Sequence, residues 1–203
     1  MKKSDTKERI LNEAIKLFAE KGYEAVSVSD IADAVGIKAP SLYKHYKSKS
    51  AIFESILNRM RDADYQKAKN YEMPDGNEKI TEISFETIRG YSKAMLAYWT
   101  EESFSCSFRK MLTIEQYKSE KMAKLYENYI SCGPVEYMAD IFSVITSDRE
   151  EAYSLAVGFY GPMYLLYGIY DKTNDLQLVM ALLDKHITEF SAMIKIEKTE
   201  ENI

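Results

Sequence analysis

The chain has 203 residues, of which 46% are hydrophobic and 29% charged, with only eight Gly and four Pro. This composition excludes disordered and fibrous proteins and indicates an ordered, helix-rich protein of one or two domains. The two cysteines, Cys106 and Cys132, form no CxxC pair, and the two histidines are distant from each other, so we expect no metal site and no cofactor. The amino terminus lacks the apolar core of a secretory signal, so we expect a cytoplasmic protein with reduced thiols.

The net charge of −5 is distributed unevenly along the chain. Residues 1–60 contain 11 Lys and Arg against 8 Asp and Glu, so the remaining residues are strongly acidic. Within the basic part, residues 38–49 carry four lysines and no acid. This stretch is therefore the natural place for contacts with phosphate groups.

The first predicted element is a helix over residues 6–21, where apolar side chains recur at helical spacing before Gly22. Ser27 stands at an N-cap position, with Asp30 three residues later, and predicts a short second helix. We expect Gly36 to interrupt that helix.

Pro40 fits the first position of a third helix of about two turns, where no amide proton is needed. Ser48 then caps a longer fourth helix, over residues 48–71. Its predicted inner stripe consists of Ile52, Phe53, Ile56, Leu57 and Met60. The stretch Met73–Asn77 is the clearest turn in the sequence.

Further helices are predicted in the rest of the chain, and no strand-like alternation competes with them. They cover residues 79–100, 104–117, 119–131, a stretch resuming after a break at Gly133-Pro134 up to residue 145, 148–170 and 175–195, followed by a frayed tail over residues 197–203. The sequence therefore predicts an all-α fold.

The uncharged stretch Ala152–Tyr170 is long enough to span a membrane, but it contains five Tyr, three Gly and Pro162 and is flanked by charges. We expect no membrane contact and assign it to a helix buried on most sides in a dimer core. Pro162 leaves the carbonyl of Gly158 without a donor, so this helix is either kinked or broken into two.

Three short helices with a glycine-containing turn between the second and third describe a helix-turn-helix. Four short motifs accompany these helices, at residues 19–23, 28–32, 35–37 and 41–49. Through these motifs the sequence resembles the TetR family of bacterial regulators, over roughly residues 5–57. The expected organisation is a DNA-binding domain over residues 1–50 and a larger helical effector-binding and dimerisation domain over residues 51–203.

Leu42 and Tyr46 lie one turn apart and are expected to pack the recognition helix against the second helix, which directs its polar side chains outward. Lysine and serine can hydrogen-bond base edges, and Ala39 or the Pro40 ring can contact a thymine methyl. Tyr43 and Lys49 are expected to contact the DNA backbone, as the resemblance also implies. The predicted DNA-binding residues are Ser29, Lys38, Ala39, Pro40, Ser41, Tyr43, Lys44, His45 and Lys49. The alternative, a solvated lysine surface, does not explain why the charges coincide with the turn.

Residues 61–203 contain 13 of the 16 Tyr, the only Trp and 8 of the 10 Met. Such side chains combine apolar bodies with polar tips and suit a pocket for a small, partly apolar effector. The predicted ligand-binding residues are Tyr98, Trp99, Phe108, Met111, Met122, Tyr126, Phe159, Met163 and Tyr167. Ordinary core packing is the alternative for each of them.

The last two helices carry more apolar surface than one contact face requires, which predicts a homodimer through a four-helix interface near His186. Together these features predict a transcriptional repressor that binds a palindromic operator and is released by an effector. A DNA-binding or architectural protein without a small-molecule effector is the alternative. An enzyme is not expected, because no catalytic constellation can be named.

Overall fold

The computed structural model describes residues 3–74, 83–146 and 148–200, in which it has ten α-helices and no strand. This confirms the all-α prediction. The helices are α1 (Lys3–Lys21), α2 (Val28–Val35), α3 (Ala39–Leu42), α4 (Lys49–Asn70), α5 (Phe85–Glu101), α6 (Ser103–Glu115), α7 (Glu120–Ile130), α8 (Cys132–Phe142), α9 (Arg149–Thr173) and α10 (Leu176–Glu200).

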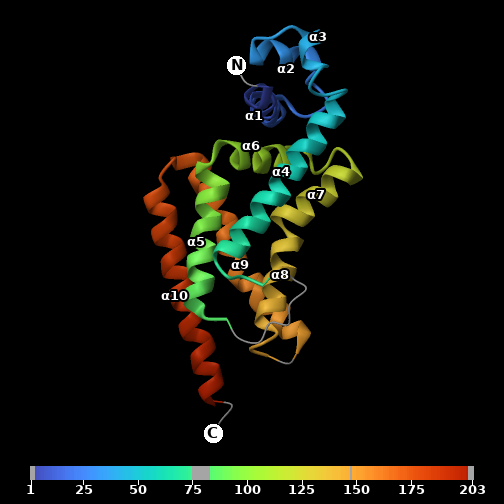
Figure 1. The fold of residues 1–203 in the computed structure, drawn as a ribbon. Coiled ribbons are helices and arrows are strands. Elements are labelled where there is room, and N and C mark those ends of the chain that lie inside the picture. Colours follow the sequence, from blue (N-terminus) through green and yellow to red (C-terminus); the bar gives the residue numbers. More distant parts are fainter. Residues whose placement is uncertain (1–2, 75–82, 147, 201–203) are drawn as a thin grey trace. The chain divides into compact units, whose positions relative to one another are not determined.

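The contacts divide the chain into two compact units. The first unit consists of Met1–Tyr65 and Glu102–Tyr126, and the second of Gln66–Glu101 and Glu127–Ile203. In the first unit α1 packs against α2 and α6, and α2 packs against α3 (Figure 1). In the second unit α9 packs against α5, α8 and α10 (Figure 1). The division into a DNA-binding domain over residues 1–50 and an effector-binding domain over residues 51–203 stays a prediction, because these two units are defined by packing and not by function.

The caps of α2 form as the sequence predicts. The Ser27 amide donates to Asp30 Oδ2 at 2.7 Å, while the Asp30 amide donates to Ser27 Oγ at 3.1 Å. These two hydrogen bonds form a capping box. Hydrogen bonds from Ser27 lower the pKa of the Asp30 carboxyl. At the other end Gly36 takes a left-handed conformation with φ 76°, which glycine adopts without strain.

The third helix is shorter than predicted. It has four residues, and Pro40 is the second of them, because Lys38 keeps an extended backbone as N-cap and Ala39 takes the first position. The predicted break at Gly133-Pro134 is also wrong, since both residues lie in the first turn of α8, where a proline is tolerated. The chain breaks at Ser131 instead, with φ −118° and ψ −92°.

Other boundaries differ by a few residues. α10 continues to Glu200, so the predicted fraying from residue 197 is wrong for the described part, and residues 201–203 lie outside it. Residues 79–82 of the predicted fifth helix and residues 75–77 of the predicted turn also lie outside the described residues. Ser48 caps α4 as predicted, accepting the Ala51 amide at 3.1 Å, and all five residues of the predicted inner stripe are buried.

Pro162 lies inside α9, which continues as one helix from Arg149 to Thr173, so the alternative of two shorter helices is wrong. His186 of α10 is hydrogen-bonded through Nε2 to the carbonyl oxygen of Phe159 at 2.9 Å. Its ring also packs against Phe159 and Phe190, with centroids 5.9 Å away in each case. None of the helices in the described ranges combines the length and the hydropathy that crossing a bilayer requires.

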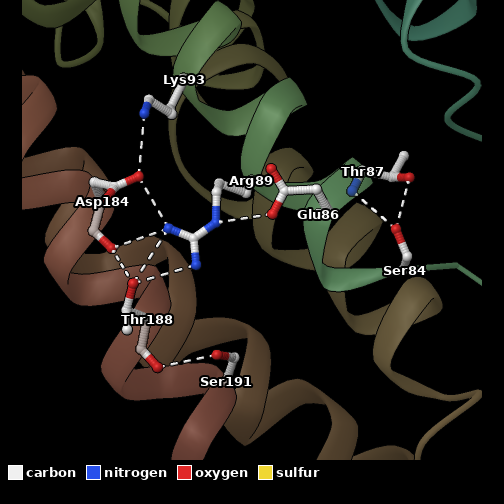
Figure 2. A network of polar contacts seen from close by, with 8 residues as sticks. All are labelled: Ser84, Glu86, Thr87, Arg89, Lys93, Asp184, Thr188 and Ser191. Atoms are coloured by element: carbon white, nitrogen blue, oxygen red, sulfur yellow. Dashed lines mark hydrogen bonds and ion pairs between the residues drawn. The ribbon is translucent and has the colours of Figure 1, made fainter.

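A polar network joins α5 to α10 (Figure 2). Arg89 Nη1 donates to Asp184 Oδ1 at 2.9 Å, and Lys93 Nζ donates to the same oxygen at 3.1 Å. Both guanidinium Nη atoms also lie 3.2 Å from Thr188 Oγ1. Hydrogen bonds from Lys93 and Arg89 lower the pKa of the Asp184 carboxyl.

Candidate nucleic-acid interface

The recognition segment, by which we mean residues 38–49, is held by its apolar side chains. Leu42 of α3 and Ile31 of α2 are fully buried, and Tyr46 is 8% exposed. Burial is also the main cause that raises the pKa of the Tyr46 phenol. Because these side chains point inward, Tyr43 and Lys44 between them are presented on the other side of the segment.

Most of the predicted base-contacting and backbone-contacting side chains lie on the surface. Ser29, Lys38, Pro40, Tyr43 and Lys44 are exposed, and Tyr43 stands out for an aromatic residue at 52% exposure. Ala39 and Ser41 are half-buried. Five of the nine predicted residues are therefore exposed, and the other four, Ala39, Ser41, His45 and Lys49, are half-buried.

His45 is half-buried rather than directed outward. Its Nδ1 is buried and meets no hydrogen-bond partner among the residues that the structure describes. In this conformation Nδ1 is therefore not available to a base edge.

Lys49 points into the protein. Its Nζ donates to the carbonyl oxygens of Tyr23 at 2.8 Å and Glu24 at 3.3 Å, and it lies 4.4 Å from the centre of the Tyr23 ring. Its side chain is only 21% exposed. The predicted contact between Lys49 and phosphate would compete with these bonds.

Two arginines of the first unit hold helices in place, a role that sequence patterns did not identify. Arg9 Nη2 donates to the Val35 carbonyl at 2.5 Å and so satisfies the end of α2. The Arg59 guanidinium lies 3.8 Å from the centre of the Phe104 ring and donates to Glu8 Oε2 at 2.8 Å. Part of the positive charge of the amino-terminal region is therefore used within the protein.

The predicted ligand-binding residues fall in both units. Tyr98, Trp99, Phe159, Met163 and Tyr167 belong to the second unit, and Phe108, Met111, Met122 and Tyr126 to the first. All are buried except Tyr126, which is half-buried. Within the second unit the Tyr98 and Trp99 rings lie 5.2 Å apart.

An open depression of about 430 Å³ on the first unit has a different lining: Glu120, Lys121, Lys124 and Leu125. None of the predicted ligand-binding residues lines it.

The last two helices leave large apolar side chains exposed on the second unit. They are Tyr153, Val157, Tyr164, Leu165 and Ile169 on α9 and Leu178, Leu182 and Met193 on α10. Two glycines of α9, Gly161 and Gly168, are so open that an added Cβ would meet no atom within 4 Å. We call these ten residues the α9–α10 face.

Comparison with known proteins gives consistent matches. The family model described as "Bacterial regulatory proteins, tetR family" matches residues 10–56. The chain is 31% identical over 130 residues to the "Biofilm operon icaADBC HTH-type negative transcriptional regulator IcaR" of Staphylococcus aureus, which is 60% of this chain and 69% of that protein.

Solved structures match the whole fold. A Clostridium perfringens "putative fatty acid metabolism regulator" superposes with a TM-score of 0.67 at 19% identity, covering 90% of this chain and 97% of that one. The "SmeT-Triclosan complex" superposes with a TM-score of 0.63 at 16% identity, covering 91% of each chain. At these identities the likeness concerns the fold.

Proposed function

Because this chain belongs to the TetR family of bacterial regulatory proteins, and is thus a transcriptional regulator, we propose that it acts as a homodimeric repressor released from its operator by a small-molecule effector. Two recognition segments would enter successive major grooves about 34–36 Å apart on a palindromic site. The site of action would be the cytoplasm, where the bacterial chromosome lies.

The observation that carries the proposal is the recognition segment itself. Lys38, Tyr43 and Lys44 are exposed around the buried Leu42, and the stretch from Lys38 to Lys49 contains no acid. Exposed cations without neighbouring carboxylates attract phosphates, and a helix start with its side chains outward fits a major groove. Regulation by repression is supported by the name of the staphylococcal relative, a negative transcriptional regulator.

The α9–α10 face supports the homodimer. Its members are exposed apolar side chains and open glycines on two helices that pack against each other. A second copy of the same face would cover it in a four-helix arrangement.

The response to an effector is supported by two observations. One solved structure of this fold is a complex with triclosan. The aromatic residues of the second unit, including Tyr98 and Trp99, have apolar bodies and polar tips that suit a small, partly apolar effector. An effector acts only through its different affinities for two conformations, so operator and effector would weaken each other's binding. Helix α4, which has residues in both units, is the proposed lever.

The experiment that tests DNA binding is footprinting of the purified protein on the DNA upstream of its own gene. Variants then separate the two kinds of contact. Tyr43→Ala and Lys44→Ala should weaken binding to all sequences, whereas Lys38→Ala and Ser41→Ala should change the preferred sequence. Unchanged affinity and preference in all four variants would remove the recognition segment from the interface.

The alternative is a DNA-binding regulator without a small-molecule effector. A thermal-shift screen followed by operator release distinguishes the two, because an effector must both stabilise the protein and lower its affinity for DNA. An enzymatic function is not proposed, since the family consists of regulators and no catalytic group can be named.

A further inference from the structure

The turn between α1 and α2 is held from two sides. Glu115, the last residue of α6, accepts the amide of Tyr23 on Oε1 at 3.1 Å. Lys49, the first residue of α4, donates to the Tyr23 carbonyl at 2.8 Å. Both backbone polar groups of this one residue are therefore bonded to charged side chains of other helices, within the first unit.

Glu115 is unusual for a carboxylate because only 1% of the residue is exposed. A buried carboxylate is costly unless it is paired and hydrogen-bonded. Its Oε1 receives both the Tyr23 amide and Lys118 Nζ, the latter at 2.7 Å. The Lys118 side chain is 50% exposed, so the ion pair has a solvated and a buried partner. The carboxylate is thus fixed at the turn.

Gly22 makes this close approach possible. Its φ is +85°, and a Cβ added there would lie 2.6 Å from Glu115 Oε1 and 2.8 Å from Lys118 Nζ. The next residue is also confined, because the Tyr23 ring lies 5.1 Å from Phe18 and 5.0 Å from Phe53 between ring centres. The turn is therefore packed closely against the Glu115 carboxylate.

We propose that Glu115 is a positioning residue for operator binding: it fixes the Gly22–Tyr23 turn and thereby the placement of α2, against which α3 packs. The inference rests on the proposed DNA-binding function. Glu115 need not touch DNA for this role, since a hydrogen bond to a charged group can hold a backbone segment in one place.

The test compares three substitutions of Glu115 on a duplex that the wild-type protein selects from random DNA. Glu115→Gln keeps a carbonyl acceptor for the Tyr23 amide, while Glu115→Ala removes it and Glu115→Asp withdraws it by shortening the side chain. The matched control is Glu120→Gln on α7, whose ion pair with Lys124 is exposed. Affinities for the selected duplex and for random DNA are measured where all variants are folded, together with hydrogen exchange of the Tyr23 amide.

We expect Glu115→Ala and Glu115→Asp to bind the selected duplex about tenfold more weakly, with little change on random DNA. Glu115→Gln and the control should stay within about twofold of wild type, because each keeps an acceptor for the Tyr23 amide. The Tyr23 amide should exchange faster only in the Ala and Asp variants. If Glu115→Ala does not fold, Glu115→Asp carries the comparison.

The results that differ from these expectations each contradict either the proposed function or the proposed role of Glu115. A wild-type protein that selects no sequence contradicts the proposed function, and this inference with it. A selected duplex that the Ala and Asp variants bind as tightly as wild type leaves the function intact and contradicts the role of Glu115. An equal loss on selected and random DNA, or a loss that Gln does not restore, contradicts positioning by the hydrogen bond to the Tyr23 amide.

Discussion

Two roles compete for the Lys49 side chain, which either holds the turn between α1 and α2 or contacts the DNA backbone. Its ammonium group holds the carbonyls of Tyr23 and Glu24 and faces the Tyr23 ring. We expect Lys49→Ala to lower the free energy of unfolding by about 1–2 kcal/mol, because these carbonyls lose a charged donor. Tyr43→Ala, at a residue that is half-exposed, should change it by less than about 0.5 kcal/mol. Urea unfolding of both variants measures the difference.

The same two variants are then compared on DNA. A Lys49→Ala variant that keeps the stability of wild type and still loses DNA affinity would show that Lys49 leaves the turn to contact phosphate. Glu115 alone would then position the turn.

At this scale, local patterns were predictable and distant contacts were not. The Ser27–Asp30 capping box and the burial of Leu42 depend on residues three or four apart, a spacing that a sequence displays directly. The bond from Lys49 to Tyr23 spans 26 positions, and that from Glu115 spans 92. Neither spacing leaves a periodic signal, so these contacts became visible only in the folded chain.

Between helices, the clearest polar joint is the network of Arg89, Lys93 and Asp184 that holds α5 against α10 (Figure 2). The pKa of Asp184 is lowered by hydrogen bonds from Lys93 and Arg89, so the carboxylate stabilises the fold above its ordinary pKa. This contribution is lost as the pH falls through the lowered folded-state pKa.

We therefore expect the free energy of unfolding to decrease below about pH 4, and to decrease less in Asp184→Asn than in wild type. Urea unfolding over a pH series measures this. Lys93→Gln, which removes the first cause of the shift, should bring the pKa of Asp184 back toward its ordinary value in an NMR titration. Parallel pH profiles for wild type and Asp184→Asn would contradict the assignment.

The existence of the helices was predictable from apolar spacing, but their ends depended on local backbone choices. The predicted break at Pro134 is wrong because the first turn of a helix accepts proline, and Pro162 alone permits either a kinked helix or two helices. In the structure α9 continues through Pro162 while packing against α5, α8 and α10. Those contacts join segments that are distant in the sequence. The residues around Pro162 therefore could not show whether the helix continues or breaks.

For the whole molecule, the surface proposed to form the dimer is the α9–α10 face. Gly161 has open space around it in the protomer, so a larger side chain there causes no clash within one copy. We expect Gly161→Leu to raise the dimer dissociation constant by at least about tenfold while leaving the protomer folded. Sedimentation velocity over a dilution series measures the dissociation constant.

Lys16→Leu, at an exposed position of α1 in the first unit, serves as the control for added surface hydrophobicity. An equal change in the dissociation constant for both substitutions would contradict a dimer interface on α9.

The apolar excess of the last two helices was predictable from the sequence. The ligand-binding residues were less predictable from the sequence, because an aromatic ring in a core and one in a pocket have the same helical spacing.

The orientation of Lys49 has a consequence for how binding responds to ionic strength. Among the four lysines from Lys38 to Lys49, the Lys49 ammonium group donates to carbonyl oxygens of its own chain. Lys38, Lys44 and Lys47 are exposed. Each phosphate contact releases condensed counterions and steepens the decline of affinity with salt by roughly 0.9 in a double-logarithmic plot. With its ammonium group held by the turn, Lys49 should therefore add nothing to the salt slope of operator binding.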